Sequence, residues 1–311
     1  MGFDLDSLSR IVAEHGRVTR VVIAATHGSC PRETGAAMLV WEGGQSGTIG
    51  GGALEYELAR AARAQTVACR LSRHALGPEM GQCCGGAVEV VSEVYDAATL
   101  PEAEAVVARP VAGPAPMPLS VKRLLATARS QGRAPEAQLL DGWMIEPVAR
   151  ATMDLWIWGA GHVGRALVAV LDPLPETRIT WVDTAPDRFP DDIPEGVTAL
   201  PAADPARLVA HAPRDAHHLI LTYSHALDLE LCHQLLQHGF AGAGLIGSAT
   251  KWARFRKRLA ALGHAPDQID SIRCPIGDPG LGKHPQAIAV GVAAGILRNG
   301  AQSCLQQGKT A

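Results

Sequence analysis

The second half of the chain alternates short apolar runs with amphipathic segments, which is the pattern of a parallel β-sheet joined by crossover helices. Apolar and β-branched residues predict the strands, and helical spacing predicts the segments between them. The expected strands are 155–158, 178–183, 218–223 and 243–248, and the expected helices are 164–171, 228–238 and 285–298. We therefore expect a Rossmann-like parallel-sheet domain over residues 151–311.

The first half has a different pattern, in which strand-like and helical runs occur without regular alternation. Strands are expected at 20–26, 37–41, 87–95 and 143–146, and helices at 8–15, 53–64 and 121–131. Residues 101–118 carry many Ala and Pro residues without a clear period, which indicates a loop-rich segment. We expect an N-terminal α+β domain over residues 1–150, so that the whole chain is an α/β protein of two domains. Residues 150–154 are the expected linker.

Composition argues against nucleic acid and membrane as partners. The formal net charge is −3 and only 4% of the residues are aromatic, so clustered cations and base-stacking rings are poorly supplied. The most basic cluster, 251–258, is expected to be the solvated face of one helix. No apolar run approaches the roughly 20 residues that span a bilayer.

The number of cysteines and the N-terminal residues indicate in which cellular compartment the protein is expected. The first residues are acidic and lack a basic segment followed by an apolar core, so we expect no signal peptide. Seven cysteines are an odd number, which is typical of free thiols in a reducing environment. We therefore expect a cytoplasmic protein.

The strongest local motif of the second half is a glycine fingerprint between the first expected strand and its helix. It reads Gly159-Ala160-Gly161-His162-Val163-Gly164, and Asp183 ends the second strand. In this context the first glycine permits a tight turn, the second lets a phosphate approach, and the third allows close packing of helix and strand. The helix N-terminus would bind the anion. Asp183 is expected either to accept hydrogen bonds from a ribose or another diol, or to act as a turn residue.

The first half carries two adjacent cysteines in a glycine-rich tract, Gly81-Gln82-Cys83-Cys84-Gly85-Gly86. Glycines leave room for a ligand to approach the thiols. Three interpretations stay open for Cys84: a ligand-binding or sulfur-handling thiol, a metal ligand, or a small buried residue of a turn. A structural zinc site is not expected, because Cys30, Cys69 and Cys274 are isolated from one another.

Several other residues are candidates for binding a ligand. Arg32 has a fork of donors suited to phosphate or carboxylate, and Gly50 and Gly51 form a second loop that could bind an anion. His162 is expected to point toward the crevice at the fingerprint. His225 and Asp228 follow the third strand of the second domain, where open α/β sheets bind ligands, although Asp228 is equally expected to cap its helix.

These motifs, taken together, resemble a known family. The N-terminal domain of the XdhC/CoxI family, the xanthine dehydrogenase accessory proteins, is similar to segments 28–36, 50–55 and 81–86. Its C-terminal Rossmann domain is similar to segments 159–164, 182–183, 224–230, 244–248 and 275–277. Cys30 departs from the serine that the family usually has, and Tyr223-Ser224 departs from the His-Asp of many members, which weakens any metal or acid–base role for His225.

The resemblance implies a chaperone rather than a catalyst. Such a protein would bind the molybdenum cofactor (molybdopterin), hold it while a cysteine desulfurase supplies the terminal sulfido ligand, and insert it into apo-xanthine dehydrogenase. Upstream proteins of molybdenum-cofactor biosynthesis are implied partners, and a homodimer is plausible. The family register places its cysteine directly before Gly85-Gly86, so Cys84, with Cys83 beside it, becomes the thiol expected near molybdenum.

Two other functions are weighed against this one. An NAD(P)-dependent oxidoreductase would explain the glycine fingerprint and Asp183, but would leave the first domain and the cysteine tract without a role. A thiol enzyme with Cys84 as its nucleophile would need a base that the sequence does not identify.

Overall fold

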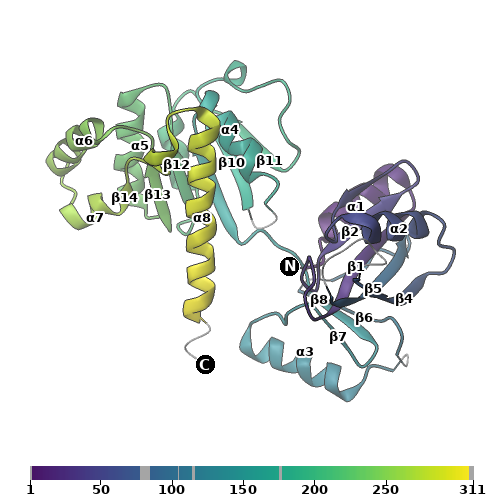
Figure 1. Cartoon of the computed structure of the whole chain (residues 1–311). Helices are drawn as coiled ribbons and strands as arrows, with labels where there is room; N and C mark the ends of the chain where they lie inside the picture. Colours follow the sequence, from purple (N-terminus) through teal and green to yellow (C-terminus); the bar gives the residue numbers. More distant parts are fainter. Residues whose placement is uncertain (1, 78–84, 104, 114–115, 175–176, 308–311) are drawn as a thin grey trace. The chain divides into compact units, whose positions relative to one another are not determined.

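The computed structural model describes residues 2–77, 85–103, 105–113, 116–174 and 177–307 (Figure 1). Chain contacts divide it into two compact units, Met1–Arg150 and Ala151–Ala311. The first is a mixed antiparallel and helical unit, and the second is a parallel-sheet unit, so the expected α/β fold class is confirmed.

The N-terminal unit is built on a five-stranded antiparallel sheet in the order β3-β2-β1-β5-β4. Its strands are β1 (Val18–His27), β2 (Ala37–Trp41), β3 (Gly44–Gly47), β4 (Cys69–Ala75) and β5 (Ala87–Tyr95). Successive side chains of β1 point to opposite faces of the sheet. Val21 and Ile23 therefore lie in a core shared with helix α2 (Gly52–Arg63), while Val22 and Ala24 lie on the opposite face.

A second, three-stranded sheet packs against that opposite side. It comprises β6 (Val106–Pro110), β8 (Trp143–Pro147) and β7 (Gln138–Leu140), in that spatial order. Met144 of β8 packs with Val22 and Ala24, whereas Ile145 packs with Val121 of helix α3 (Leu119–Gln131) on the other face. Helix α1 (Leu5–His15) forms a further core with β1 and Tyr95. The unit is thus layered as helix, sheet, sheet and helix.

Four strands of this unit were not predicted from the sequence, and one of them is β3, which is only four residues long and follows a glycine turn. β4 is an edge strand in which most residues are half-exposed or exposed, so it lacks a clear apolar alternation. β6 lies inside the Ala- and Pro-rich segment 101–118, where we had expected a loop, and β7 has only three residues. Pairing with longer neighbours, which the local sequence does not reveal, makes these segments strands.

A buried network of four charged residues joins the two sheets. Arg20 of β1 donates to both oxygens of Glu146 on β8, at 2.6 and 3.0 Å, and these side chains are 2% and 0% exposed. Arg109 of β6 donates to Glu146 at 2.8 Å and to Glu93 of β5 at 2.7 Å. The Arg20 guanidinium also lies 4.2 Å from the ring centroid of Phe3. The charges are paired, which is what makes their burial tolerable.

The C-terminal unit contains a six-stranded parallel sheet in the order β11-β10-β9-β12-β13-β14. The strands are β9 (Met153–Trp158), β10 (Thr177–Asp183), β11 (Val197–Pro201), β12 (His217–Ile220), β13 (Gly242–Leu245) and β14 (Ile272–Arg273). Numbered within the unit, this is the order 3-2-1-4-5-6 of the Rossmann fold, in which ligands bind where the order reverses, here between β9 and β12.

Helices cover both faces of this sheet (Figure 1). On one face, α4 (His162–Leu171) and α8 (Pro285–Gln307) pack with Leu155 and Ile157 of β9. On the other, α5 (His225–His238), α6 (Ala249–Ala261) and η3 (Pro205–His211) pack with Trp156 and Trp158. The remaining helical segments are η2 (Pro186–Arg188), α7 (Pro266–Asp270) and η4 (Pro279–Leu281). Within the described part of the chain, no helix is both long and apolar enough to cross a membrane.

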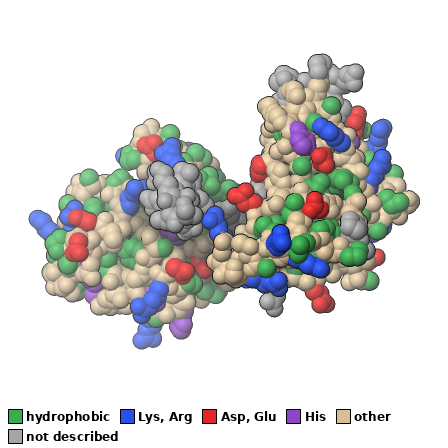
Figure 2. Space-filling view, turned by 90° about the horizontal axis from the view of Figure 1, so that it is seen from below, with side chains coloured by type: hydrophobic (Ala, Val, Ile, Leu, Met, Phe, Trp, Pro, Cys, Tyr) green, Lys and Arg blue, Asp and Glu red, His purple; other side chains and the backbone are tan. Residues whose placement is uncertain are grey.

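The basic cluster 251–258 lies on α6, but it is not wholly solvated as we had expected. Phe255 is buried, and the Lys251 side chain is only 11% exposed because it pairs with the buried Asp228. Elsewhere positive and negative side chains are interspersed, and the described residues of the face seen in Figure 2 carry no broad patch of one sign.

We predict that Glu146→Gln destabilises the N-terminal unit by about 3–5 kcal/mol, because two buried guanidinium groups lose their shared carboxylate. Glu33→Gln is the matched control in the same unit, since Glu33 pairs with Arg32 at the surface, where such pairs contribute about 1 kcal/mol or less. Urea titration followed by NMR signals of β1 and β8 measures the effect. A cost for Glu146→Gln no larger than that of the control would contradict the role given to the network.

Because of the same network, we predict that the N-terminal unit loses stability at acidic pH. Burial raises the pKa of Glu146, but the charges of Arg20 and Arg109 outweigh it and hold the pKa below its ordinary value. A carboxyl with a lowered native pKa contributes stability above its unfolded pKa of about 4.3 and loses it as the pH falls through the native pKa. Urea titrations between neutral pH and pH 3 should therefore show falling stability below about pH 4.3, with a shallower fall in Glu146→Gln. Equal slopes in the two proteins would contradict this.

Candidate functional site

The glycine fingerprint lies where the strand order reverses, and its three glycines have different surroundings. Gly159, at φ +121°, packs so closely on the end of β12 that an added Cβ would lie 2.5 Å from the Leu221 carbonyl oxygen. A Cβ on Gly164 would collide with the carbonyl of Gly159. A Cβ on Gly161 would meet nothing within 4 Å. The first and third glycines therefore hold the loop together, and the second leaves its surface open.

The open position adjoins the N-terminus of α4. Gly161 is the N-cap, and no side chain caps the first amides of the helix. Such amides bind anions, helped by the helix dipole. The loop is therefore suited to a phosphate or another anionic group.

Asp183 does not present a free carboxylate to this crevice. It is 5% exposed and accepts hydrogen bonds from the Ala160 amide at 2.6 Å, the Thr184 amide at 2.6 Å and the Thr184 hydroxyl at 3.0 Å. Asp183 thereby holds the glycine loop against the end of β10. This arrangement matches the turn interpretation better than the ribose interpretation.

Other side chains lie after the carboxyl ends of the strands, near the glycine loop. His162, the first residue of α4, and His225, the first residue of α5, are both exposed. Arg188 stacks on the ring of Tyr223, with its guanidinium carbon 4.7 Å from the centroid, and Tyr223 is 68% exposed. Sequence analysis did not name Arg188, and it named Tyr223 only as a departure from the family pattern. The sequence could have indicated Arg188 as a candidate, because it follows shortly after the acid that ends β10. An arginine at that place in a dinucleotide fold can bind a phosphate.

Asp228, on the second side of the crevice, is neither a free ligand group nor the helix cap. Its side chain is fully buried and accepts from the Thr222 hydroxyl at 2.7 Å and from Lys251 Nζ at 2.6 Å. Ser224 is the N-cap of α5. The Asp228–Lys251 pair ties the loop after β12 to the start of α6.

In the N-terminal unit, three sequence motifs converge at one edge of the five-stranded sheet. A Cβ on Gly86 would collide with the Ser29 carbonyl, and a Cβ on Gly28 would lie 3.3 Å from the Gly86 Cα. A Cβ on Gly50 would lie 2.8 Å from Pro31 Cγ. The loop after β1 therefore packs against both the glycine loop before α2 and the end of the cysteine tract.

The second glycine loop uses its amides internally. One oxygen of Glu55 accepts from the amides of Ile49 and Gly51, each at 3.0 Å, and from the Thr48 hydroxyl at 2.6 Å. Burial raises the pKa of Glu55, but these hydrogen bonds outweigh it and hold the pKa below its ordinary value. The Gly50 amide donates to the Thr48 hydroxyl at 3.1 Å. Neither glycine therefore has an unbonded amide for an anion, although Gly51 faces open space.

Arg32 and Cys30 lie on the loop after β1. The Arg32 side chain is 25% exposed, and its Nε lies 3.5 Å from a carboxylate oxygen of Glu33. The Cys30 sulfur lies 3.4 Å from the Ala87 carbonyl, beside the end of the cysteine tract. Arg32 is thus accessible near the convergence of the three motifs, and Cys30 fits a packing role.

Cys83 and Cys84 lie outside the described residues, so the placement of these predicted site residues stays a prediction. Gly85, which follows them, is exposed and has open space around its Cα. Burial raises the pKa of Cys69 to about 11 and also raises that of Cys274, so these thiols stay protonated near neutral pH. Among the residues with described side chains, no three His, Cys, Asp or Glu groups gather to hold a metal ion.

Comparisons with known proteins give two family matches. A model described as the XdhC Rossmann domain matches residues 155–296, and a model of the XdhC and CoxI family matches residues 11–73. No curated protein matches the chain significantly.

A solved structure from another organism has the same fold. A structure from Bacillus halodurans, titled as a xanthine dehydrogenase, is 19% identical, with a TM-score of 0.65 over 95% of each chain. A Rossmann-fold NAD(P)-binding family protein from Shigella flexneri is 11% identical and matches 36% of this chain and 63% of its own, with a TM-score of 0.28. That second likeness is too weak to carry an argument.

Because the fingerprint glycines have different surroundings, the same substitution should cost much more stability at one of them than at another. Gly164→Ala should lower the free energy of unfolding by several kcal/mol, because its methyl group meets backbone that cannot move aside. Gly161→Ala should cost no more than about 1 kcal/mol, the scale of a changed N-cap. Urea unfolding of the two variants measures the difference. Equal costs would show that the loop is not packed as described.

Proposed function

Because the chain belongs to the XdhC and CoxI family of xanthine dehydrogenase accessory proteins, we propose that it binds the molybdenum cofactor as cargo. In this proposal it holds molybdopterin while a cysteine desulfurase adds the sulfido ligand, and then inserts the cofactor into apo-xanthine dehydrogenase. It receives the cofactor from upstream biosynthesis proteins in the cytoplasm, and a homodimer is the proposed assembly.

The observation that carries the proposal is the convergence of three motif loops in the N-terminal unit. The backbone of Gly86 is packed against the loop that bears Arg32, and that loop packs against Gly50. The chain that leaves the Cys83-Cys84 tract is thereby anchored where an accessible arginine and an open glycine surface lie. A soft thiol and a cation would together suit a cargo that combines a dithiolene-bound metal with a phosphate. We propose Cys84 as the thiol near molybdenum.

The glycine loop of the C-terminal unit, taken by itself, would also suit an anionic, aromatic molecule. The uncapped amides of α4 would bind phosphate, and Arg188 would add a cation beside them. The exposed Tyr223 ring is suited to stacking against a planar heterocycle. We include His162 and His225 as rim residues of this contact.

An NAD(P)-dependent oxidoreductase is the second candidate, and one observation disfavours it. The acid at the end of the second strand of a dinucleotide fold usually accepts hydrogen bonds from ribose, but here Asp183 is buried and already accepts three hydrogen bonds. Calorimetric titration with NAD and NADP tests this candidate, and tight binding of either would revive it.

We predict that the purified protein retains molybdenum cofactor and that Cys84→Ala retains much less without a loss of stability. The matched control is Cys83→Ala, which should retain more cofactor because Cys84 holds the family register. Protein incubated with the cofactor is separated by gel filtration, and the bound pterin is oxidised and measured by its fluorescence.

Two results would contradict this assignment. Equal retention by both cysteine variants and the unmodified protein would remove the thiol from the site. A loss confined to Gly161→Val would place the cofactor contact at the glycine loop of the C-terminal unit instead, because that substitution fills only the open glycine position.

A further inference from the structure

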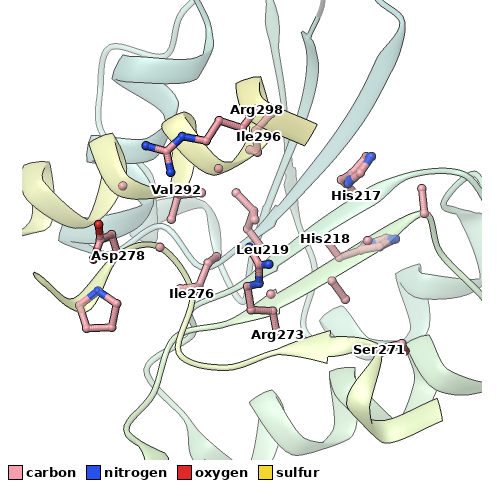
Figure 3. Close-up of a pocket in the computed structure, with 18 residues that line it drawn as sticks. His217, His218, Leu219, Ser271, Arg273, Ile276, Asp278, Val292, Ile296 and Arg298 are labelled. Atoms are coloured by element: carbon pink, nitrogen blue, oxygen red, sulfur yellow. The ribbon is translucent and has the colours of Figure 1, made fainter. Parts of the chain in front are cut away.

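A cavity of about 450 Å³ lies in the C-terminal unit between the β12–β14 face of the sheet and helix α8 (Figure 3). None of the residues that line it belongs to the glycine loop or to the loop after β12. The first residues of β12 and β13, His217 and Gly242, line the cavity. The glycine loop described above lies instead at the carboxyl ends of the strands. The cavity is therefore separate from that crevice.

Small residues create this space. β13 carries Gly242 and Gly244 on the cavity side, where an added Cβ would lie 2.7 Å from the His217 ring and 2.9 Å from Ile276. Packing therefore explains why these two positions are glycine. Gly295 of α8 is different, because a Cβ there would meet nothing within 4 Å although the residue lines the cavity. The wall formed by α8 is open at this point.

The cavity combines apolar walls with two arginines. Leu219 and Ile276 line it from the sheet side, and Val292 and Ile296 line it from α8. Arg273 of β14 and Arg298 of α8 line it as well, so they approach it from the sheet and from the helix (Figure 3).

The charges of these arginines are not balanced within the described part of the chain. Neither Arg273 nor Arg298 forms an ion pair or a side-chain hydrogen bond with a described residue. Asp278 is the one carboxylate among the lining residues, and it accepts from the Gly280 amide at 2.9 Å. Burial lowers the pKa of His217, so its ring stays neutral near pH 7 and adds no positive charge.

We infer that this cavity binds a small aromatic anion of about the size of a nucleoside monophosphate. The volume falls within the usual range of small-molecule pockets, roughly 300–1,000 Å³. Guanidinium groups recognise phosphate and carboxylate groups, and the apolar residues of both walls would contact a ring. Asp278 can accept a hydrogen bond from an amino or hydroxyl group of the same ligand.

The test is calorimetric titration of the full chain with AMP and GMP, using adenosine and inorganic phosphate as controls that each lack one part of the ligand. We expect a nucleotide to bind at millimolar concentration or better, and both controls to bind more weakly. Arg273→Gln and Arg298→Gln should each weaken binding by about 10- to 100-fold, the effect of losing a charged hydrogen bond. Arg254→Gln, which removes an exposed arginine of α6, should leave binding unchanged.

Two glycine variants identify where the nucleotide binds. Gly295→Leu fills the open wall and improves helix propensity, so it should abolish binding without lowering the melting temperature. Gly161→Val fills the open position of the glycine loop and should leave binding at the α8 cavity intact. Absence of binding by both nucleotides, equal binding of either control, or a loss caused by Gly161→Val and not by Gly295→Leu would each overturn the inference.

Discussion

Close contact between backbones at glycine is the constraint on which both candidate binding surfaces depend. Gly159 and Gly164 bring the fingerprint loop against itself and against β12, and Gly86 brings the end of the cysteine tract against the loop after β1. A side chain at any of these positions would meet backbone, which has no rotamer to change. Other glycines in the same loops, Gly51 and Gly161, face open space instead. The closed glycines shape the loops, and the open ones leave their surfaces accessible.

Carboxylates that accept hydrogen bonds within the chain complete this arrangement, and they limit the groups that remain available for chemistry. Asp183 and Glu55 accept amide hydrogen bonds from the two glycine loops, and Asp228 pairs with Lys251. These acids are used to position the backbone, so the groups left facing solvent are amides, arginines, histidines and an aromatic ring. That set is suited to holding a charged heterocyclic molecule.

The sequence predicted the four central strands of the parallel sheet, β10, β9, β12 and β13, because they are largely buried apolar runs that can be recognised without knowing their partners. The two closed glycines of the fingerprint also have the packing roles that their spacing implied. The sequence did not predict β3, β4, β6 or β7 in the first unit, nor β11 and β14 of the parallel sheet, because these strands are short or partly exposed and depend on pairing with neighbours. The roles of Asp183 and Asp228 were also open, because donors distant in the sequence determine whether a carboxylate is free. Arg188, Tyr223 and the α8 cavity became visible only when loops and helices were placed together.

The central claim is that this protein carries the molybdenum cofactor. Its most direct test is to load the purified chain with cofactor and to measure molybdenum and pterin together in the protein fraction after gel filtration. The account predicts that both elute with the protein in equal amounts and that added NADP does not displace them. Elution of the protein without pterin, or release of the pterin by NADP, would contradict it.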